Sequence, residues 1–161
     1  MATRREDLGS WLEGTPGDTS DGGRSGAGLP ARGPGSMATV PRRLAALAVD
    51  WLLSLGVSAA FLPDPARAGS GILSGDEVAT LVVFAVSTTI LIGLLGHTVG
   101  HRLLGVRVVR LTTSDGAQQA PGLAAALLRT GLLCLVIPAV VWNGEGRGMH
   151  DVAAGTVVVR R

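Results

Sequence analysis

The sequence predicts an all-α membrane protein with three apolar helices, the third kinked or re-entrant, and a small two-stranded β element at the membrane surface. Apolar runs of 19, 19 and 21 residues span Leu44–Leu62, Val78–Gly96 and Gly122–Trp142. About 20 residues of helix cross a hydrocarbon core. Charged residues make up 16% of the 161-residue chain, below the share of about 25% in soluble domains. Two valine-rich segments next to glycine, at 105–111 and 155–160, predict the strands.

The first 36 residues differ in composition from the rest of the chain. They are rich in glycine, proline and serine and poor in apolar residues, which predicts a mostly disordered tail. Within this tail, residues 5–13 place Leu8, Trp11 and Leu12 at helical spacing, which predicts a short amphipathic helix. The remainder, 37–161, is expected to form one transmembrane domain. Its predicted helices lie at about 42–62, 78–97 and 122–142.

Helix-starting and helix-stopping residues support these helices. Pro41 suits the first turn of the first helix, and Pro63 stops that helix. Asp76 provides a negative charge at the start of the second helix, where the helix dipole favours it. Pro121 opens the third helix, and Pro138 should kink it near its end.

The distribution of arginines predicts the orientation of the domain. Arginines precede the first apolar run and follow the second, whereas the connection at 63–77 has one arginine against three acids. The N-terminus and the 97–121 loop should therefore be cytoplasmic. A third complete crossing would put Arg147 outside and separate the two strands. We therefore expect the third run to return to the cytoplasmic side. The alternative is that the third run crosses fully and the C-terminal segment is an exception to the positive-inside rule.

Asp50 is an acid inside the first apolar run. A carboxylate at membrane depth costs about 3 kcal/mol, so it usually has a partner or a function. Arg43 lies two helical turns earlier and shares a face with Asp50. We expect Arg43 or Arg129 to neutralise Asp50. Such a pair would form either an ion or proton site, or a buried ion pair that specifies helix packing.

Three histidines are candidate metal ligands or proton carriers. His97 and His101 are four residues apart, and Asp50, His150 or Asp151 could add a third ligand. The alternative is two interfacial histidines, and two histidines alone do not make a metal site, so no metal or other cofactor is expected. Asp151 either forms a proton-handling pair with His150 or belongs to a turn, where it caps a short helical turn or accepts hydrogen bonds from loop amides, with Arg147 as its neighbour.

The remaining motifs argue against an enzyme. The sequence has no metalloprotease HExxH, no P-loop, no nucleophile elbow and no dinucleotide fingerprint. The net charge of +2 is too small to indicate a nucleic-acid partner. The expected partners are therefore the lipid bilayer and either a second copy of the chain or another membrane protein.

Four segments in order carry a resemblance to a known family: PRRLAALAVDWLL, GHTVGHRLLGVRVVRL, ALLRT and GRGMHDVAAGTVVV. Over about residues 36–161 the chain resembles the RDD family of small bacterial integral membrane proteins, in particular its short members from high-GC bacteria. Arg43, Asp50 and Asp151 match the arginine and the two aspartates of that family. Its G-x-T-x-G-x-R-L-x-G stretch is matched by Gly96, Thr98, Gly100, Arg102 and Gly105.

The resemblance carries functional expectations. It implies a multi-pass protein of the bacterial cell membrane, with transport of ions or small solutes, by the protein alone or as a transporter subunit, as the function suggested for the family. The alternative is a membrane scaffold or accessory protein in which the arginine and aspartate set is structural. Family members often carry a basic residue where His97 or His101 stands here, which weakens a metal site further.

Overall fold

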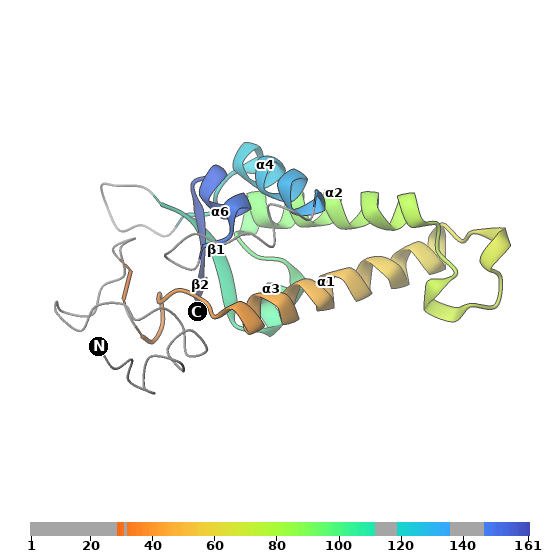
Figure 1. The fold of residues 1–161 in the computed structure, drawn as a ribbon, viewed down its shortest axis with the longest axis horizontal. Helices are drawn as coiled ribbons and strands as arrows, with labels where there is room; N and C mark the ends of the chain where they lie inside the picture. The colour runs from red at the N-terminus through yellow and green to blue at the C-terminus, as the bar shows by residue number, and fades with distance from the viewer. Residues whose placement is uncertain (1–28, 31, 112–118, 136–146) are drawn as a thin grey trace, which may run out of the picture.

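The protein is a long helical hairpin with a small α/β unit at one end. The computed structural model describes residues 29–30, 32–111, 119–135 and 147–161. Helices α1 (Val40–Phe61) and α2 (Glu77–Leu95) form the hairpin, and the other labelled helices and strands gather where α1 begins and α2 ends (Figure 1). The predicted tail, with its helix at 5–13, lies outside the described residues except for its last few positions.

The two long helices have the length and composition of membrane spans. α1 has 22 residues and α2 has 19, which corresponds to about 33 and 28 Å at 1.5 Å per residue. These are the two helices in the described part of the chain that are long and apolar enough to cross a membrane. The Asp76 carboxylate caps α2 by accepting a hydrogen bond from the Ala79 amide at 2.7 Å. Gly96 ends α2 in the left-handed conformation at φ 73°.

The third apolar helix is shorter than the sequence predicted. α4 (Leu123–Cys134) has 12 residues, about 18 Å, which is too short to cross a hydrocarbon core. The remainder of the predicted helix, with Pro138, falls at 136–146 and lies outside the described residues. Two of the three predicted apolar helices are therefore confirmed as candidate spans.

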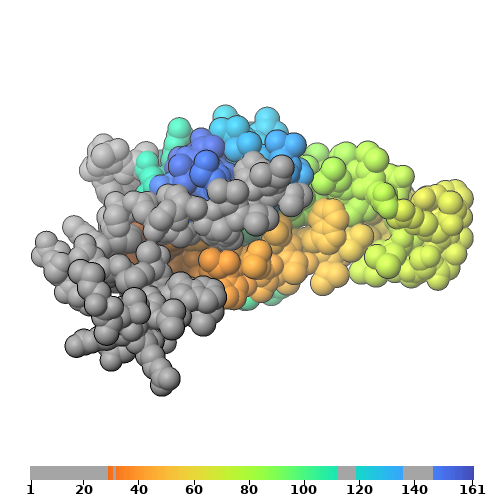
Figure 2. Space-filling view, viewed as in Figure 1, coloured from red at the N-terminus to blue at the C-terminus, as the bar shows by residue number. Residues whose placement is uncertain are grey.

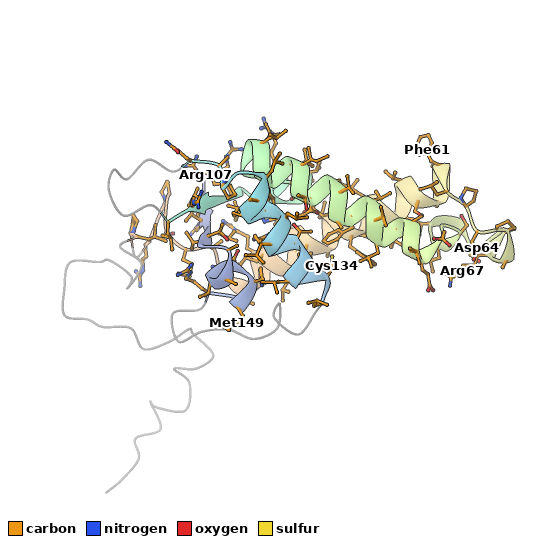
Figure 3. The ribbon with its side chains drawn as sticks, turned by 90° about the horizontal axis from the view of Figure 1, so that it is seen from above. Phe61, Asp64, Arg67, Arg107, Cys134 and Met149 are labelled. Carbon is orange, nitrogen blue, oxygen red and sulfur yellow. The ribbon has the colours of Figure 1, made fainter. Side chains whose placement is uncertain are left out.

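The connection between α1 and α2 forms the end of the hairpin opposite the α/β unit (Figures 2 and 3). It contains two short 3₁₀ turns, η2 (Pro65–Arg67) and η3 (Gly71–Leu73). The Ser58 hydroxyl donates to the Asp76 carbonyl at 3.1 Å and ties the two helices together there. Arg67 forms an exposed ion pair with Glu77.

The predicted two-stranded element is confirmed. Strands β1 (Val106–Arg110) and β2 (Thr156–Arg160) pair antiparallel, with Val108 opposite Val158. Each strand follows a five-residue helix, α3 (Val99–Leu103) or α6 (Met149–Ala153). Glycine makes each turn from helix to strand, because Gly105 and Gly155 have φ of 63° and 62°.

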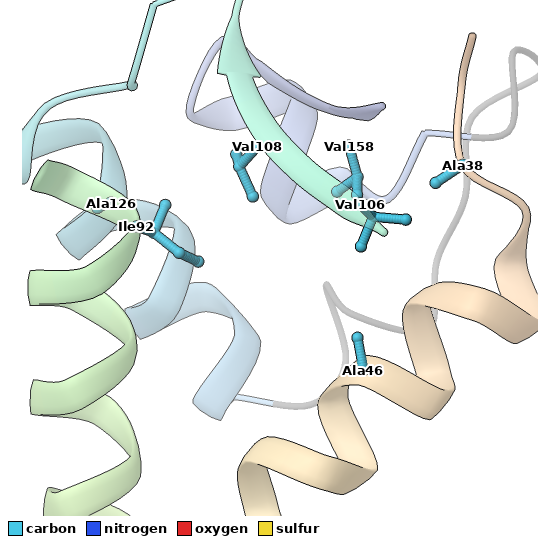
Figure 4. Close-up of a cluster of buried hydrophobic side chains, with 7 residues drawn as sticks. All are labelled: Ala38, Ala46, Ile92, Val106, Val108, Ala126 and Val158. Carbon is cyan, nitrogen blue, oxygen red and sulfur yellow. The ribbon is translucent and has the colours of Figure 1, made fainter. Parts of the chain in front are cut away.

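One face of this sheet makes the main apolar core. Val106, Val108 and Val158 pack against small or branched side chains from the start of α1, the end of α2 and α4, which Figure 4 shows; these partners are Ala46, Ile92 and Ala126. The segment before α1 also joins the sheet, because Ala38 donates its amide hydrogen to the Val158 carbonyl at 2.9 Å. The sheet thus holds the beginning of α1 and the C-terminus at the same end of the hairpin.

Candidate functional site

A cavity of about 660 Å³ lies between α1, α2 and α4. Most of its wall is apolar. Cys134, which lies at the end of α4 (Figure 3), also lines the cavity. The same wall holds charged or imidazole groups from four helices, α1, α3, α4 and α6. These are Arg43, Asp50, His101, Arg129 and His150. The cavity therefore combines an apolar surface with a concentrated set of ionisable groups, as small-molecule sites do.

Asp50 is held by the start of α3. Its Oδ1 accepts a hydrogen bond from the Gly100 amide at 2.7 Å, and its Oδ2 accepts one from the Thr98 hydroxyl. His101 Nδ1 lies 3.7 Å from Oδ2. Asp50 comes ten residues after the first residue of α1, about 15 Å along it, which places the acid near the middle of the helix.

The Asp50 contacts form a continuous hydrogen-bonded chain. The Thr98 hydroxyl has one hydrogen to donate, and it donates it to Asp50. The contact between Thr98 Oγ1 and His101 Nδ1 then requires the hydrogen to lie on Nδ1. A relay therefore runs from His101 through Thr98 to Asp50. Burial lowers the pKa of His101, against the opposing effect of Asp50, so the imidazole is neutral at pH 7.

The expectation that an arginine neutralises Asp50 was wrong. Neither Arg43 nor Arg129 forms an ion pair with Asp50; both lie next to Asp151 instead. Arg43 and Asp50 do share a face of α1, since both line the cavity. The partners of Asp50 are an amide, a hydroxyl and an imidazole supplied by α3, which a helical-spacing argument on α1 alone does not reveal.

Asp151 is the buried acid that pairs with the two arginines. Its Oδ1 accepts hydrogen bonds from Arg129 Nε at 2.7 Å and from the Thr156 hydroxyl at 3.0 Å. Its Oδ2 lies 4.0 Å from an Arg43 nitrogen and 3.6 Å from His150 Nε2. Burial opposes ionisation of Asp151, but Arg129, His150 and Arg43 outweigh it and hold its pKa below the usual range.

The prediction that Asp151 caps a short helical turn was wrong. The capping position of α6 belongs to Gly148, and Asp151 lies inside the helix. Its carboxylate joins α6 to α4, and Arg43 brings α1 to the same cluster. Arg147, expected as its neighbour, donates a hydrogen bond to the Thr156 carbonyl at 2.8 Å.

The other motif residues have distinct positions. Thr98 caps α3 by accepting a hydrogen bond from the His101 amide at 3.1 Å. Gly100 approaches α1 so closely that an added Cβ would lie 2.1 Å from the Ala46 carbonyl oxygen. Gly96 and Gly105 adopt positive φ at the ends of α2 and α3. Arg102 is exposed and lies outside both acid clusters.

The helical spacing proposed for a histidine metal site does not occur. Gly96 ends α2, so His97 falls between two helices while His101 lies in α3. Among residues 29–30, 32–111, 119–135 and 147–161, no group of three or more metal-ligating side chains is placed to hold a metal ion.

A second cavity of about 240 Å³ also borders Asp50. Its hydroxyl-bearing lining residues are Ser54, Ser87, Thr88 and Thr98. Asp50 and Thr88 line both cavities, so this pair lies in the wall that separates them. Thr88 was not among the residues predicted from the sequence. The spacing of Thr80 and Thr88 could have indicated it, because the two buried hydroxyl residues are eight apart and lie on one face of α2.

Comparison with known proteins identifies one family. A family model described as the RDD family matches residues 37–155. No curated protein and no solved structure matches the chain.

Proposed function

We propose that this chain, which belongs to the RDD family, is a multi-pass protein of the bacterial cell membrane that transports ions or small solutes and exchanges a proton at Asp50. The observation that carries the proposal is the position of Asp50 in the wall between two cavities. A group reachable from two cavities can take up a proton or cation from one and release it to the other. No enzymatic activity is proposed.

The two buried acids suit different roles. Asp151 is bonded to Arg129 and lies next to Arg43, and guanidinium groups stay charged at any physiological pH. Asp151 therefore has a permanent partner and a structural role. Asp50 accepts hydrogen bonds from a hydroxyl and a backbone amide and has a neutral imidazole 3.7 Å away. The hydroxyl and the imidazole allow a proton to arrive or leave. Ionisable groups at membrane depth commonly mark such pathways.

Size argues that the transporting unit is an oligomer. In the part of the chain that the structure describes, two candidate spans and one shorter apolar helix are too few to enclose a complete pathway. The smaller cavity, between the exposed apolar faces of α1 and α2, is where a second copy would add the missing wall.

A scaffold role is the second candidate, and one observation favours it. Every side-chain contact of Asp50 described above goes to α3, and Gly100 meets the α1 backbone at very short range. Asp50 would then hold α3 against α1 and have no part in flux. The two candidates make opposite predictions for an Asp50 variant that folds.

Asp50→Asn separates the two candidates. We expect the purified variant to fold but to lose proton flux, because an amide cannot bind and release the proton. The measurement is the pH change inside proteoliposomes loaded with a pH-sensitive dye, after an imposed Na⁺, K⁺ or Li⁺ gradient. Asp64→Asn, on the exposed connection, is the matched control and should keep wild-type flux. Absence of flux in the wild type with every cation would contradict proton-coupled cation transport.

A second variant keeps this test decisive if Asp50→Asn does not fold. His101→Asn places an amide nitrogen near the position of Nδ1, so the bond to Thr98 can persist while the relay loses its titratable group. Under the transport proposal, flux falls and thermal stability stays close to that of the wild type. Under the scaffold role, thermal stability falls, and any proton flux, divided by the amount of folded protein, equals that of the wild type.

The proposed topology places both ends of the chain in the cytoplasm. It is supported by the pairing of β1 with β2, which holds the C-terminus beside the start of α1, and by the acid-rich connection. In a Cys134→Ser background, a cysteine at Ser70→Cys should react with a membrane-impermeant maleimide in intact cells. A cysteine appended after Arg161 should react only after permeabilisation. Labelling of the appended cysteine in intact cells would overturn this topology.

A further inference from the structure

The interface between α1 and α2 carries buried hydroxyl groups on the side of Asp50 that faces the connection between the two helices. On α1 the buried residues recur every four positions, and after Asp50 they are Ser54 and Ser58. Steps of four residues are about 6 Å along a helix. On α2 the buried hydroxyl residues are Thr80 and Thr88. These four hydroxyl residues form a seam that leads from Asp50 toward the connection.

Thr88 differs from the other members of the hydroxyl seam. Its residue surface is only 4% exposed, and among the described residues no hydrogen bond uses its hydroxyl. The hydroxyls of Ser54, Ser58 and Thr80 each donate to a backbone carbonyl, at 2.9, 3.1 and 2.7 Å. A buried hydroxyl without a protein partner is unfavourable, and in native structures such groups commonly bind ordered water.

The smaller cavity provides the space for this water. Asp50, Ser54 and Thr88 all line it, and its volume is about 240 Å³. A water molecule takes about 30 Å³ in the liquid, so several fit, and cavities with polar walls hold water whereas apolar cavities stay dry. Each Asp50 carboxylate oxygen accepts one hydrogen bond from α3, which leaves lone pairs that can accept another from water.

We propose that Thr88 positions a water molecule that carries the proton between Asp50 and the smaller cavity. This inference rests on the proposed proton exchange at Asp50. The protonated carboxyl group of Asp50 transfers its proton to this water and becomes a carboxylate, and the water passes a proton to the next water in the cavity. Thr88 fixes the water and undergoes no net change. The relay from His101, which lines the larger cavity, and the water at Thr88 then connect Asp50 to different cavities.

Thr88→Val tests this role, because valine keeps the shape of threonine and removes the hydroxyl. We expect proton flux in the proteoliposome assay to fall about tenfold, since the barrier rises by about the strength of one hydrogen bond. Thermal stability should stay close to that of the wild type, because Thr88 has no side-chain hydrogen bond to lose within the described part of the chain. Thr88→Ser keeps the hydroxyl and should retain most of the flux.

Thr89→Val is the matched control, since Thr89 is the next residue of α2 and lines neither cavity. It should keep wild-type flux. Wild-type flux in Thr88→Val would overturn the inference, and so would equal losses in Thr88→Val and Thr89→Val. A loss in Thr88→Ser as large as that in Thr88→Val would also overturn it, because the hydroxyl would then not be the cause.

A measurement of water access separates this inference from the transport proposal. In a Cys134→Ser background, silver ions should reach the thiol of Ser54→Cys in proteoliposomes and block its labelling by maleimide after unfolding. Silver reacts with the thiolate, which forms in contact with water. Val86→Cys, on the exposed apolar side of α2, should not be blocked. An unreactive Ser54→Cys thiol would show a dry cavity and overturn this inference alone, whereas absence of flux in the wild type would overturn the proposed function and the proton step with it.

Discussion

Arg129→Met is expected to lower the free energy of unfolding by about 3–5 kcal/mol, because it leaves a buried carboxylate without its main partner. Methionine is close to arginine in length and keeps the apolar contacts of α4. It removes the hydrogen bond from Arg129 Nε to Asp151 Oδ1 at 2.7 Å. The Asp151 side chain is 1% exposed, so its charge cannot be solvated by water instead. Thermal and chemical unfolding in detergent measure the loss.

A control and a rescue test this explanation. Arg102→Met removes an exposed arginine and should leave stability nearly unchanged. Adding Asp151→Asn to Arg129→Met should recover part of the loss, because it removes the buried charge that the single variant leaves without its main partner. A single variant as stable as Arg102→Met would contradict a buried ion pair at this position.

The pH dependence of the same variant has a defined sign. In the wild type the pKa of Asp151 lies below its ordinary value of 3.8, so the pair stabilises the fold above about pH 3.8. This contribution is lost as the pH falls through the folded-state pKa. Without Arg129, burial dominates and raises the pKa of Asp151. The stability difference between wild type and Arg129→Met should therefore shrink as the pH is lowered.

Gly100→Ala is expected to lower the free energy of unfolding by about 2–4 kcal/mol. A Cβ at this position would lie 2.1 Å from the Ala46 carbonyl oxygen and 2.9 Å from Asp50 Oδ2. The nearest atom belongs to the backbone of α1, which cannot move aside as a flexible side chain can. α3 must therefore shift away from α1, and this lengthens the 2.7 Å hydrogen bond from the Gly100 amide to Asp50.

Gly56→Ala is the matched control for this prediction. Gly56 lies within α1, and a Cβ added there meets nothing within 4 Å in the described part of the chain. Because alanine favours helix over glycine by about 1 kcal/mol, this variant should be as stable as the wild type or slightly more stable. Unfolding temperatures of the two variants in the same detergent make the comparison. Equal losses in both would show that close packing at Gly100 is not the cause.

Local sequence signals were sufficient for the elements that depend on near neighbours. The apolar runs located α1 and α2 because helix formation and membrane crossing depend on composition over about 20 residues. Glycine followed by valine-rich segments located β1 and β2, and the requirement that a surface strand pair with another predicted that the two would meet. The family was also recognisable from short motifs in order, and the match over residues 37–155 confirms it.

The partners of the buried charges depended on contacts between residues far apart in the chain. Helical spacing placed Arg43 and Asp50 on one face of α1 correctly, yet Arg43 pairs with Asp151 of α6, more than a hundred residues later. Asp50 instead binds α3, because Gly96 ends α2 and turns the chain so that Thr98 and the Gly100 amide meet α1. The sequence by itself determined that Asp50 and Arg129 lie within apolar segments, and both are buried. Only the tertiary structure decided which of them pair, because a hydrogen bond or ion pair requires separations of about 3 to 4 Å, and long-range packing alone establishes these.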